Sequence, residues 1–473
     1  MTGPPIPPPA PGSAVTVAGA PSGPPVAPAP AGSAAPLAPA GSTAAPRAAG
    51  SAAAGQPAEH RDAGDAGGAA FVPDAAVGAG EGPVPPAAAD VVVVGAGVIG
   101  LACAWRLARQ GLAVAVFDPS PGRGSSWVAA GMLAPVTELH HGEEPLLALT
   151  LASARRWPGF AAELAGATGR HVGYDDSGTL LVAGDADDRR WAQELHRYQV
   201  DLGLAVEWLT PRRARQLEPS LAPGIAGALW APGDHQVDNR RLLAALGAAV
   251  GSAGAGLFTE RVAAVETAGG RVTGVRTAAG HTVAAPRVVL AAGWGSASLQ
   301  GLPEGLVPPV RPVKGQILRL RHRDGSPRLL GRTVRALVQG SVVYLVPRAD
   351  GEVVLGATME EMGDDTTPTA GAAYQLLRDA TRILPGVSEL AVAELAAGLR
   401  PGSPDNAPVV GAVPAGSGAD GLVIATGHHR NGVLLAPLTA DAVAALVTGG
   451  PEPPETAPFG PARFAAMPRP SRA

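Results

Sequence analysis

The apolar positions between residues 89 and 118 follow the pattern of one βαβ unit. Val91 to Val94 form a continuous apolar run, which is typical of a strand that is buried on both faces of a parallel sheet. A glycine-rich turn follows, and the stretch Ile99 to Arg109 reads as a helix that ends at Gly111. The next run, LAVAVFD at 112–118, predicts a second strand.

Helical and strand patterns alternate in blocks along the rest of the chain. From residue 146 to 233 helical stretches dominate, and short strand-like pieces such as GTLLVA join them. Residues 255–293 return to short strands separated by the turn signals AGGR and AAGH, which predicts a β-meander. The stretches VKGQILRLR, SVVYLVPR and EVVLGATM indicate longer strands of an antiparallel sheet. A helix at 370–384, the strand GLVIAT and a helix at 433–447 complete the pattern.

Both ends of the chain lack this periodicity. Residues 1–88 are mainly Pro, Ala, Gly and Ser, a composition that cannot bury enough surface to offset the entropy of ordering. We therefore expect a disordered tail, with partner binding by this tail as the alternative. Residues 450–473 are again rich in proline, and we expect a second flexible tail there. The length of 473 residues suggests two or three domains.

Charge and cysteine content narrow the class of protein. The formal net charge is −4, so no basic field favours nucleic acid as a partner. A single cysteine, Cys103, rules out a disulfide framework and fits a reducing compartment. We find no run of 18 apolar residues and no Sec-type leader, so we expect no membrane partner and a cytoplasmic location.

The glycine turn after the first strand has the spacing of a dinucleotide site. Gly95, Gly97 and Gly100 form G-x-G-x-x-G between a strand and a helix, and Asp118 ends the next strand. Glycines at these positions permit a tight turn and close approach of a pyrophosphate to the helix N-terminus. The carboxylate of Asp118 can accept hydrogen bonds from ribose hydroxyls.

The segment GHHRNG at 427–432 raises a separate question, because its side chains could serve a metal site, acid/base chemistry or a backbone cradle. The other conspicuous histidines, His140, His141 and His235, have no acidic or cysteine partner at metal spacing. The segment lies between a predicted strand and a predicted helix, where open α/β sheets bind ligands. We therefore interpret it as a backbone cradle and predict no metal.

Eight sequence blocks, in order, resemble the D-amino acid oxidase superfamily of FAD enzymes, and within it the glycine oxidases of thiamine biosynthesis. The blocks are VVVVGAGVIG at 91–100, AAGMLAP at 129–135, DHQVDNRRL at 234–242, VVLAAGWGS at 288–296, RPVKGQ at 311–316, VYLVPRADGEVVLGATMEEMG at 343–363, AGLRPGSPDNAPVVG at 397–411 and GHHRNGVLLAP at 427–437. The last three are the most specific.

This resemblance implies an α/β fold in which a Rossmann-type FAD-binding domain is interleaved with a substrate domain built on an antiparallel sheet. The FAD domain would comprise residues 89–150, 234–300 and 395–449. The substrate domain would comprise residues 151–233 and 301–394.

The resemblance also implies residues that hold FAD without a covalent bond, since Cys103 lies on the first helix and away from the flavin ring. Matching positions fall in the glycine turn, the AAGM block, the later strand ends and the GHHRNG segment. They are Gly95, Gly97, Val98, Ile99, Gly100, Asp118, Ser125, Ser126, Ala130, Gly131, Met132, Val262, Gly293, His428, His429, Arg430, Asn431, Gly432, Val433 and Leu434.

Four residues are the candidates for contact with the substrate. Arg400 matches an arginine that pairs with the substrate carboxylate, as a planar guanidinium can through two parallel hydrogen bonds. Tyr344 matches a pocket tyrosine, Met359 a residue of the pocket wall, and Arg430 an arginine near both flavin and substrate. Val342 stands where related sequences often have histidine, so a histidine contact is in doubt there.

The resemblance implies oxidation of glycine, sarcosine or D-alanine by hydride transfer to FAD. The products would be an imine or glyoxylate, ammonia and hydrogen peroxide, with dioxygen as electron acceptor and thiamine biosynthesis as the use of the imine. The alternatives are a D-amino acid or sarcosine oxidase or dehydrogenase of the same fold, and a flavin-binding subunit without activity. By the same resemblance we expect a homo-oligomer, a tetramer in the family.

Overall fold

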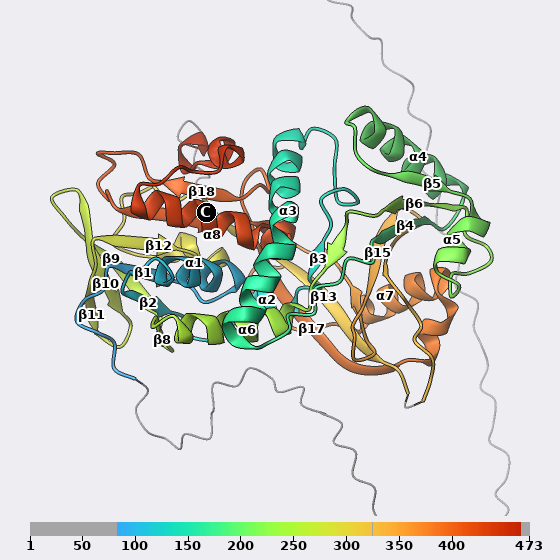
Figure 1. Cartoon of the computed structure of the whole chain (residues 1–473), viewed down its shortest axis with the longest axis horizontal. Helices are drawn as coiled ribbons and strands as arrows, with labels where there is room; N and C mark the ends of the chain where they lie inside the picture. The colour runs from blue at the N-terminus through green and yellow to red at the C-terminus, as the bar shows by residue number, and fades with distance from the viewer. Residues whose placement is uncertain (1–82, 324, 465–473) are drawn as a thin grey trace, which may run out of the picture. The chain divides into compact units, whose positions relative to one another are not determined.

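The computed structural model describes residues 83–323 and 325–464, which form the unit shown in Figure 1. Residues 1–82 of the predicted N-terminal tail and residues 465–473 of the C-terminal tail lie outside the described residues. The described chain begins with an edge contact, in which Ala89 N donates to Ala284 O at 2.9 Å and Ala284 N donates to Ala87 O at 3.0 Å.

A six-stranded sheet carries the predicted βαβ unit. Its strand order is β18 (Val409–Ala412), β19 (Leu422–Thr426), β12 (Arg287–Leu290), β1 (Val91–Val94), β2 (Val114–Phe117) and β8 (Gly256–Phe258). All neighbours are parallel except β18 and β19. Every residue of β1 is buried, as its unbroken valine run predicts.

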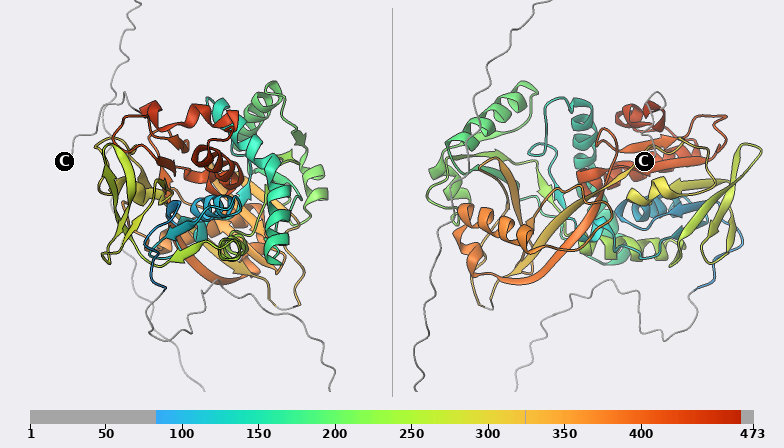
Figure 2. Two further views of the ribbon diagram at one scale, coloured as in Figure 1. Left: turned by 60° about the vertical axis from the view of Figure 1, so that its left-hand side comes forward. Right: turned by 180° about the vertical axis from the view of Figure 1, so that it is seen from behind.

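Helices cover one face of this sheet and a small β-meander covers the other. The helices are α1 (Val98–Ala108), α3 (Glu144–Thr168), α6 (Asn239–Ser252) and α8 (Gly432–Thr448), and their apolar residues share one core with the sheet. Figure 2 shows the long helix α3 beside α8 and α1. The meander consists of β9 (Val262–Ala268), β10 (Arg271–Thr277) and β11 (Thr282–Ala284), which pack in a second core with the strands.

An eight-stranded sheet forms the other half of the described chain. Its strand order is β17 (Ala391–Gly402), β13 (Arg311–Arg321), β16 (Glu352–Gly356), β15 (Ser341–Pro347), β14 (Thr333–Val338), β4 (Thr179–Ala183), β6 (Gly227–Ala231) and β5 (Glu207–Leu209). All neighbours are antiparallel except β14 and β4. Alternate side chains of these strands face a core that includes helix α7 (Ala370–Ile383).

Short elements complete the fold. They are α2 (Ser125–Val128), the strand pair β3 (Met132–Leu133) and β7 (His235–Gln236), α4 (Ala186–Asp201), α5 (Pro211–Leu217), η1 (Gly293–Ser298), η2 (Pro385–Glu389), η3 (His429–Asn431), η4 (Pro454–Phe459) and η5 (Pro461–Phe464). The β3–β7 pair and α2 lie in the segments that connect the two large sheets.

The segment boundaries expected from the sequence differ from the packing at three places. Helix α3 was expected in the substrate domain from residue 151 on, but Trp157 and Phe160 are buried in the core of the six-stranded sheet. The boundary at 395 falls inside β17, which belongs to the eight-stranded sheet throughout. Residues 450–464 were expected to be flexible, but they form η4 and η5, and Phe459 is buried against α3 and α8.

One helix is more apolar than the sequence analysis, which found no run of 18 apolar residues, led us to expect. Among the described residues, the helical stretch His429–Thr448 is long and apolar enough to cross a membrane by length and composition alone. About 67% of its most apolar part is buried inside the molecule. Helix α8 packs against both α1 and α3 in the core of the six-stranded sheet.

Candidate active site

A cavity of about 370 Å³ runs from the glycine turn of the six-stranded sheet to one face of the eight-stranded sheet. Most of the predicted cofactor and substrate residues line it. Those that do are Gly97, Val98, Ile99, Asp118, Ser125, Ser126, Ala130, Gly131, Met132, Gly293, Tyr344, Met359, Arg400, His428, His429, Arg430, Gly432 and Val433. The remaining five, Gly95, Gly100, Val262, Asn431 and Leu434, lie outside the lining.

The glycine turn has the close contacts that its motif predicts. A Cβ on Gly95, whose φ is +104°, would lie 2.4 Å from Ala291 O, and a Cβ on Gly100 would lie 1.8 Å from Gly95 O. The N-cap residue of α1 is Gly97, which has no side chain that could cap the helix. Asp118 accepts hydrogen bonds from Ala96 N at 2.8 Å and from Ser120 N at 2.7 Å, so its carboxylate fixes the turn and also borders the cavity.

The segment from Ser125 to Met132 forms the wall next to this turn. Val98 N donates to Ser126 Oγ at 3.1 Å, which ties the start of α1 to α2. Gly131 has a φ of +72°, and a Cβ there would lie 2.0 Å from Val237 O. Only glycine therefore permits the chain to pass this close to Val237, the residue after β7.

The eight-stranded sheet presents Arg400 and Tyr344 to the cavity. Arg400 Nη1 donates to Thr358 O at 3.1 Å, and its guanidinium lies over Gly315, where a Cβ would approach Nη1 to 2.3 Å. No carboxylate of the described chain lies within ion-pair distance of Arg400, although the residue borders the cavity. An arginine without such a partner is well suited to bind a carboxylate ligand.

Tyr344 stands beside Arg400 on the same face of the sheet. Gly356 pairs with it across the strands and leaves room for the ring, since a Cβ at Gly356 would lie 2.5 Å from the Tyr344 hydroxyl. Burial raises the pKa of Tyr344, and the positive charge of Arg400 opposes part of this effect. The phenol therefore remains protonated at neutral pH and can donate a hydrogen bond.

Arg430 has different surroundings from Arg400. Its Nη2 donates to Glu143 Oε2 at 2.5 Å and to Glu138 O at 3.2 Å, and its Nε lies 3.8 Å from Glu138 Oε2. Glu138 in turn pairs with Arg335 at 2.5 Å. Two carboxylates thus already pair with the Arg430 guanidinium, although Arg430 also lines the cavity, and its contact with the substrate stays a prediction.

The two histidines of GHHRNG are buried and uncharged. Burial lowers the pKa of both to about 3, helped at His429 by the charges of Arg400 and Arg430. His428 Nε2 shares a hydrogen bond of 3.0 Å with Thr439 Oγ1. His429 has a φ of +47°, and neither of its ring nitrogens has a partner in the described part of the chain.

The other residues of this segment shape the start of α8. Gly432 and Val433 border the cavity, whereas Asn431 is buried behind it and donates from its backbone N to His428 O at 2.9 Å. Leu434 O accepts from Ser153 Oγ at 2.7 Å and from Trp157 Nε1 at 2.9 Å, which joins α8 to α3. The described residues contain no group of three or more His, Cys, Asp or Glu side chains that could hold a metal ion.

The sequence reading missed several residues of the lining. They include Glu138, His140, Trp294, Gly315, Arg335 and Thr358. Arg335 pairs with Tyr344 across β14 and β15, so the register of the hairpin could have revealed it once Tyr344 was chosen. Glu138 and His140 lie in an irregular loop after β3, for which no periodic signal exists.

Comparison with known protein families shows the family to which the chain belongs. Residues 90–446 match the family described as FAD dependent oxidoreductase. The chain belongs to this family. The match covers both sheets and the whole cavity lining, so FAD is the cofactor that the fold is built to hold.

Individual members of the FAD dependent oxidoreductase family show similar coverage. A glycine oxidase from Geobacillus kaustophilus is 36% identical over 78% of this chain and 96% of its own length. The crystal structure of glycine oxidase from that organism superposes with a TM-score of 0.73 at 34% identity, over 79% of this chain and 98% of that one. An iminodiacetate oxidase from Chelativorans gives a TM-score of 0.69 at 28% identity, over 78% and 98%.

Other relatives are longer. The bifunctional protein ThiO/ThiG of Synechocystis is 34% identical over 79% of this chain, and the match covers 54% of that protein. The chain therefore spans about half the length of the bifunctional relatives that it matches.

The residues of the cavity fit FAD. Gly97, Val98 and Ile99 bring the N-terminus of α1 to one end, where helix N–H groups can meet a pyrophosphate. Asp118 can meet a ribose, and the segments Ser125–Met132 and His428–Val433 would flank the remainder of the cofactor. The positions of individual FAD contacts, including the one expected at Val262, stay predictions.

Proposed function

We propose that this protein oxidises the amine carbon of glycine and of other small amines such as sarcosine and D-alanine. One observation carries the proposal: Arg400 has no carboxylate partner in the described chain and lies beside Tyr344 in the cavity that fits FAD. The similarity to glycine oxidases over nearly their whole length supports glycine as the first substrate to test.

In this proposal Arg400 and Tyr344 hold the substrate by its carboxylate. The guanidinium supplies two parallel N–H donors, and the protonated phenol supplies a third. Since Gly315 and Gly356 set both side chains close to the sheet, the rest of a small amino acid extends from the sheet toward the Ser125–Met132 wall. The protein thus contributes orientation, which is the main requirement of a reaction whose redox chemistry belongs to a cofactor.

Bound FAD would supply the redox chemistry by accepting a hydride from the substrate Cα and passing two electrons to dioxygen, which gives hydrogen peroxide. The substrate amine must be neutral for the carbon–nitrogen double bond to form, so its proton leaves to solvent first. The imine then takes up water and yields glyoxylate and ammonia from glycine. His429 is uncharged at neutral pH, so it adds no positive charge that would oppose the developing iminium.

A peroxide assay on the full chain loaded with FAD tests the proposal. We expect glycine, sarcosine and D-alanine each to bleach the flavin without air and to release one hydrogen peroxide per oxidised amine when air is admitted. Bleaching without reoxidation by air would instead indicate a dehydrogenase with another electron acceptor. A flavin that none of the three amines bleaches would contradict the proposal.

The wider role is also a proposal. The bifunctional ThiO/ThiG proteins join two parts in one chain, which supports delivery of the imine to thiamine biosynthesis. We further propose a cytoplasmic homotetramer, as the family resemblance implies. Light scattering of the purified chain measures its mass directly, and a monomer would overturn the tetramer.

A further inference from the structure

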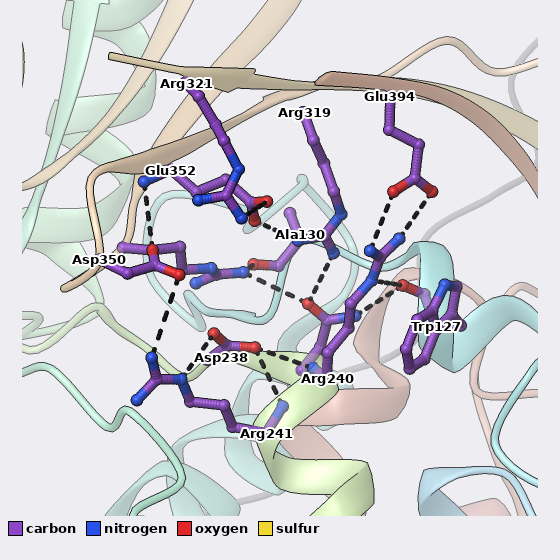
Figure 3. A network of polar contacts seen from close by, with 12 residues as sticks. Trp127, Ala130, Asp238, Arg240, Arg241, Arg319, Arg321, Asp350, Glu352 and Glu394 are labelled. Carbon is purple, nitrogen blue, oxygen red and sulfur yellow. Dashed lines mark hydrogen bonds and ion pairs between the residues drawn. The ribbon is translucent and has the colours of Figure 1, made fainter. Parts of the chain in front are cut away.

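A buried polar network joins the Ser125–Met132 wall to the eight-stranded sheet, and Asn239 forms hydrogen bonds to both. Figure 3 shows Trp127, Ala130, Arg240 and Arg319 of this network. Asn239 is the first residue of α6 and has 1% of its surface exposed. The side chain of Asp238 caps the helix by accepting from Arg240 N at 3.0 Å and Arg241 N at 3.1 Å. This cap fixes the backbone of the first turn of α6 and therefore the position from which the Asn239 side chain extends.

On one side the Asn239 amide binds the wall. Its Nδ2 donates to Ser126 O at 2.8 Å and to Trp127 O at 2.9 Å. The Ser126 hydroxyl accepts from Val98 N in the glycine turn, so the wall is held at two points. The contacts from Asn239 go to backbone oxygens, which means that the identity of the wall side chains does not determine them.

On the other side the same amide binds two arginines of the eight-stranded sheet and its margin. Asn239 Oδ1 accepts from Arg319 Nη2 and from Arg348 Nη2, each at 3.3 Å. Arg319 lies on β13 and forms an ion pair with Glu352. Both donors and both acceptor positions of the Asn239 amide are therefore occupied.

Arg348 forms a further hydrogen bond to the wall, at Ala130. Its Nη2 donates to Ala130 O at 2.6 Å, and its Nη1 donates to Gln236 Oε1 at 2.8 Å and to Val237 O at 3.1 Å. Only 5% of the residue is exposed, and in the described chain no carboxylate lies within ion-pair distance of it. Its charge is satisfied by neutral oxygens, one of them on the residue before Gly131.

We propose that Asn239 is a positioning residue for the cofactor: it sets the Ser126–Gly131 wall against the sheet through Arg319 and Arg348. The carbonyl oxygens of Ser126 and Ala130 accept hydrogen bonds from this network, and both residues also line the cavity. If the network loosens, the wall shifts although no residue in contact with the cofactor has changed. The proposal rests on FAD as the cofactor and not on the identity of the amine substrate.

The variant Asn239→Asp separates the two sides of the network. An aspartate keeps the shape and offers Arg319 and Arg348 a charged acceptor, but it cannot donate to Ser126 O or Trp127 O. We expect the variant to fold and its FAD dissociation constant to rise about tenfold or more, since Ser126 O loses the Asn239 donor and Trp127 O keeps only the longer bond from Arg240 Nε at 3.4 Å. The visible circular dichroism of its bound flavin should change as well.

Glu352→Gln is the matched control. It weakens the ion pair with Arg319 on the sheet side and leaves every bond to the wall in place. We expect a lower Tm and an FAD dissociation constant within about twofold of the parent. Titration of apoprotein by flavin fluorescence measures the affinity without any amine, so failure of this proposal is distinguishable from failure of the proposed oxidation.

Two outcomes would overturn the proposal. One is an Asn239→Asp protein that binds FAD as tightly as the parent with an unchanged flavin spectrum. The other applies if that variant does not fold: Arg348→Lys keeps the charge but cannot reach Ala130 O and Val237 O together. If Arg348→Lys folds and binds FAD with unchanged affinity and spectrum, the wall does not depend on the network.

Discussion

Arg400 and Arg430 show how surroundings decide what an arginine can do. Both border the cavity, and sequence resemblance gave them related roles. The Arg430 guanidinium is held by Glu143 and Glu138, whereas Arg400 donates to backbone oxygens such as Thr358 O. The motif could not distinguish these cases, because the two glutamates lie about 290 residues earlier, in a loop without a pattern.

Arg400→Lys tests the carboxylate pairing at this scale. Lysine keeps the positive charge but cannot form two parallel hydrogen bonds, so KM for glycine should rise about tenfold or more. FAD affinity should stay unchanged, because Arg400 belongs to the sheet and not to the cofactor wall. Steady-state peroxide kinetics and flavin titration measure both quantities, and an unchanged KM would remove Arg400 from the substrate site.

The buried histidines predict how stability depends on pH. His428 and His429 titrate near 6.5 when unfolded, but burial lowers the pKa of each to about 3 in the fold. Between these values the unfolded chain binds more protons, so stability is full above about pH 6.5 and falls as the pH drops. At pH 5 each histidine would cost roughly 2 kcal/mol.

His429→Phe should therefore reduce the loss of Tm between about pH 7.5 and about pH 5, since the ring is kept and one titration is removed. His171→Phe, at an exposed histidine, is the matched control for the substitution itself. If Tm fell equally with pH in the parent and in His429→Phe, the pKa of His429 would not be lowered in the fold.

At the scale of elements, three strand glycines shape the substrate end of the cavity. Gly315 and Gly398 face each other across β13 and β17, and Gly356 pairs with Tyr344. Their missing side chains are replaced by the Arg400 guanidinium, by Val128 and by the Tyr344 ring. The strands were predicted from the sequence, because their apolar runs are local signals. The side chains that fill the space beside these glycines could not be predicted, because the pairing of the strands brings them together from distant parts of the chain.

Gly315→Ala tests this arrangement. The new Cβ would lie 2.3 Å from Arg400 Nη1, so the guanidinium must move and KM for glycine should rise severalfold. A strand position tolerates alanine, so Tm should change by only a few degrees. Gly331→Ala is the control, because a Cβ there meets nothing nearer than Glu218 Oε2 at 3.7 Å. Equal KM values for the two variants would contradict the arrangement.

At the scale of the molecule, much of the fold followed from the sequence. The βαβ unit, the meander and the antiparallel strands were predictable because period and turn residues are local signals. The membership of α3 and the fold of residues 450–464 were not, because long-range packing decides them. Trp157 and Phe459 are buried by partners that come from α8, and the partner that accepts the Trp157 hydrogen bond lies 277 residues later in the chain.

Because both large sheets line one cavity, FAD should stabilise them together. Free FAD at about 100 times its dissociation constant would add roughly 2.7 kcal/mol to the free energy of unfolding. We expect a single thermal transition of the apoprotein to move upward by several degrees with added FAD. Two transitions, of which FAD moves only one, would show that the sheets unfold independently.

The contact at the start of the described chain has a consequence for shortening the protein. Ala87 and Ala89 exchange backbone hydrogen bonds with Ala284 and thereby cover the outer edge of β11. An uncovered edge strand offers free N–H and C=O groups to another copy of the chain and promotes aggregation. A chain trimmed to begin at Pro83 keeps this cover, whereas one trimmed to begin at Val91 loses it. We therefore expect the chain that begins at Val91 to aggregate more than the chain that begins at Pro83, although both keep every residue of the cavity lining.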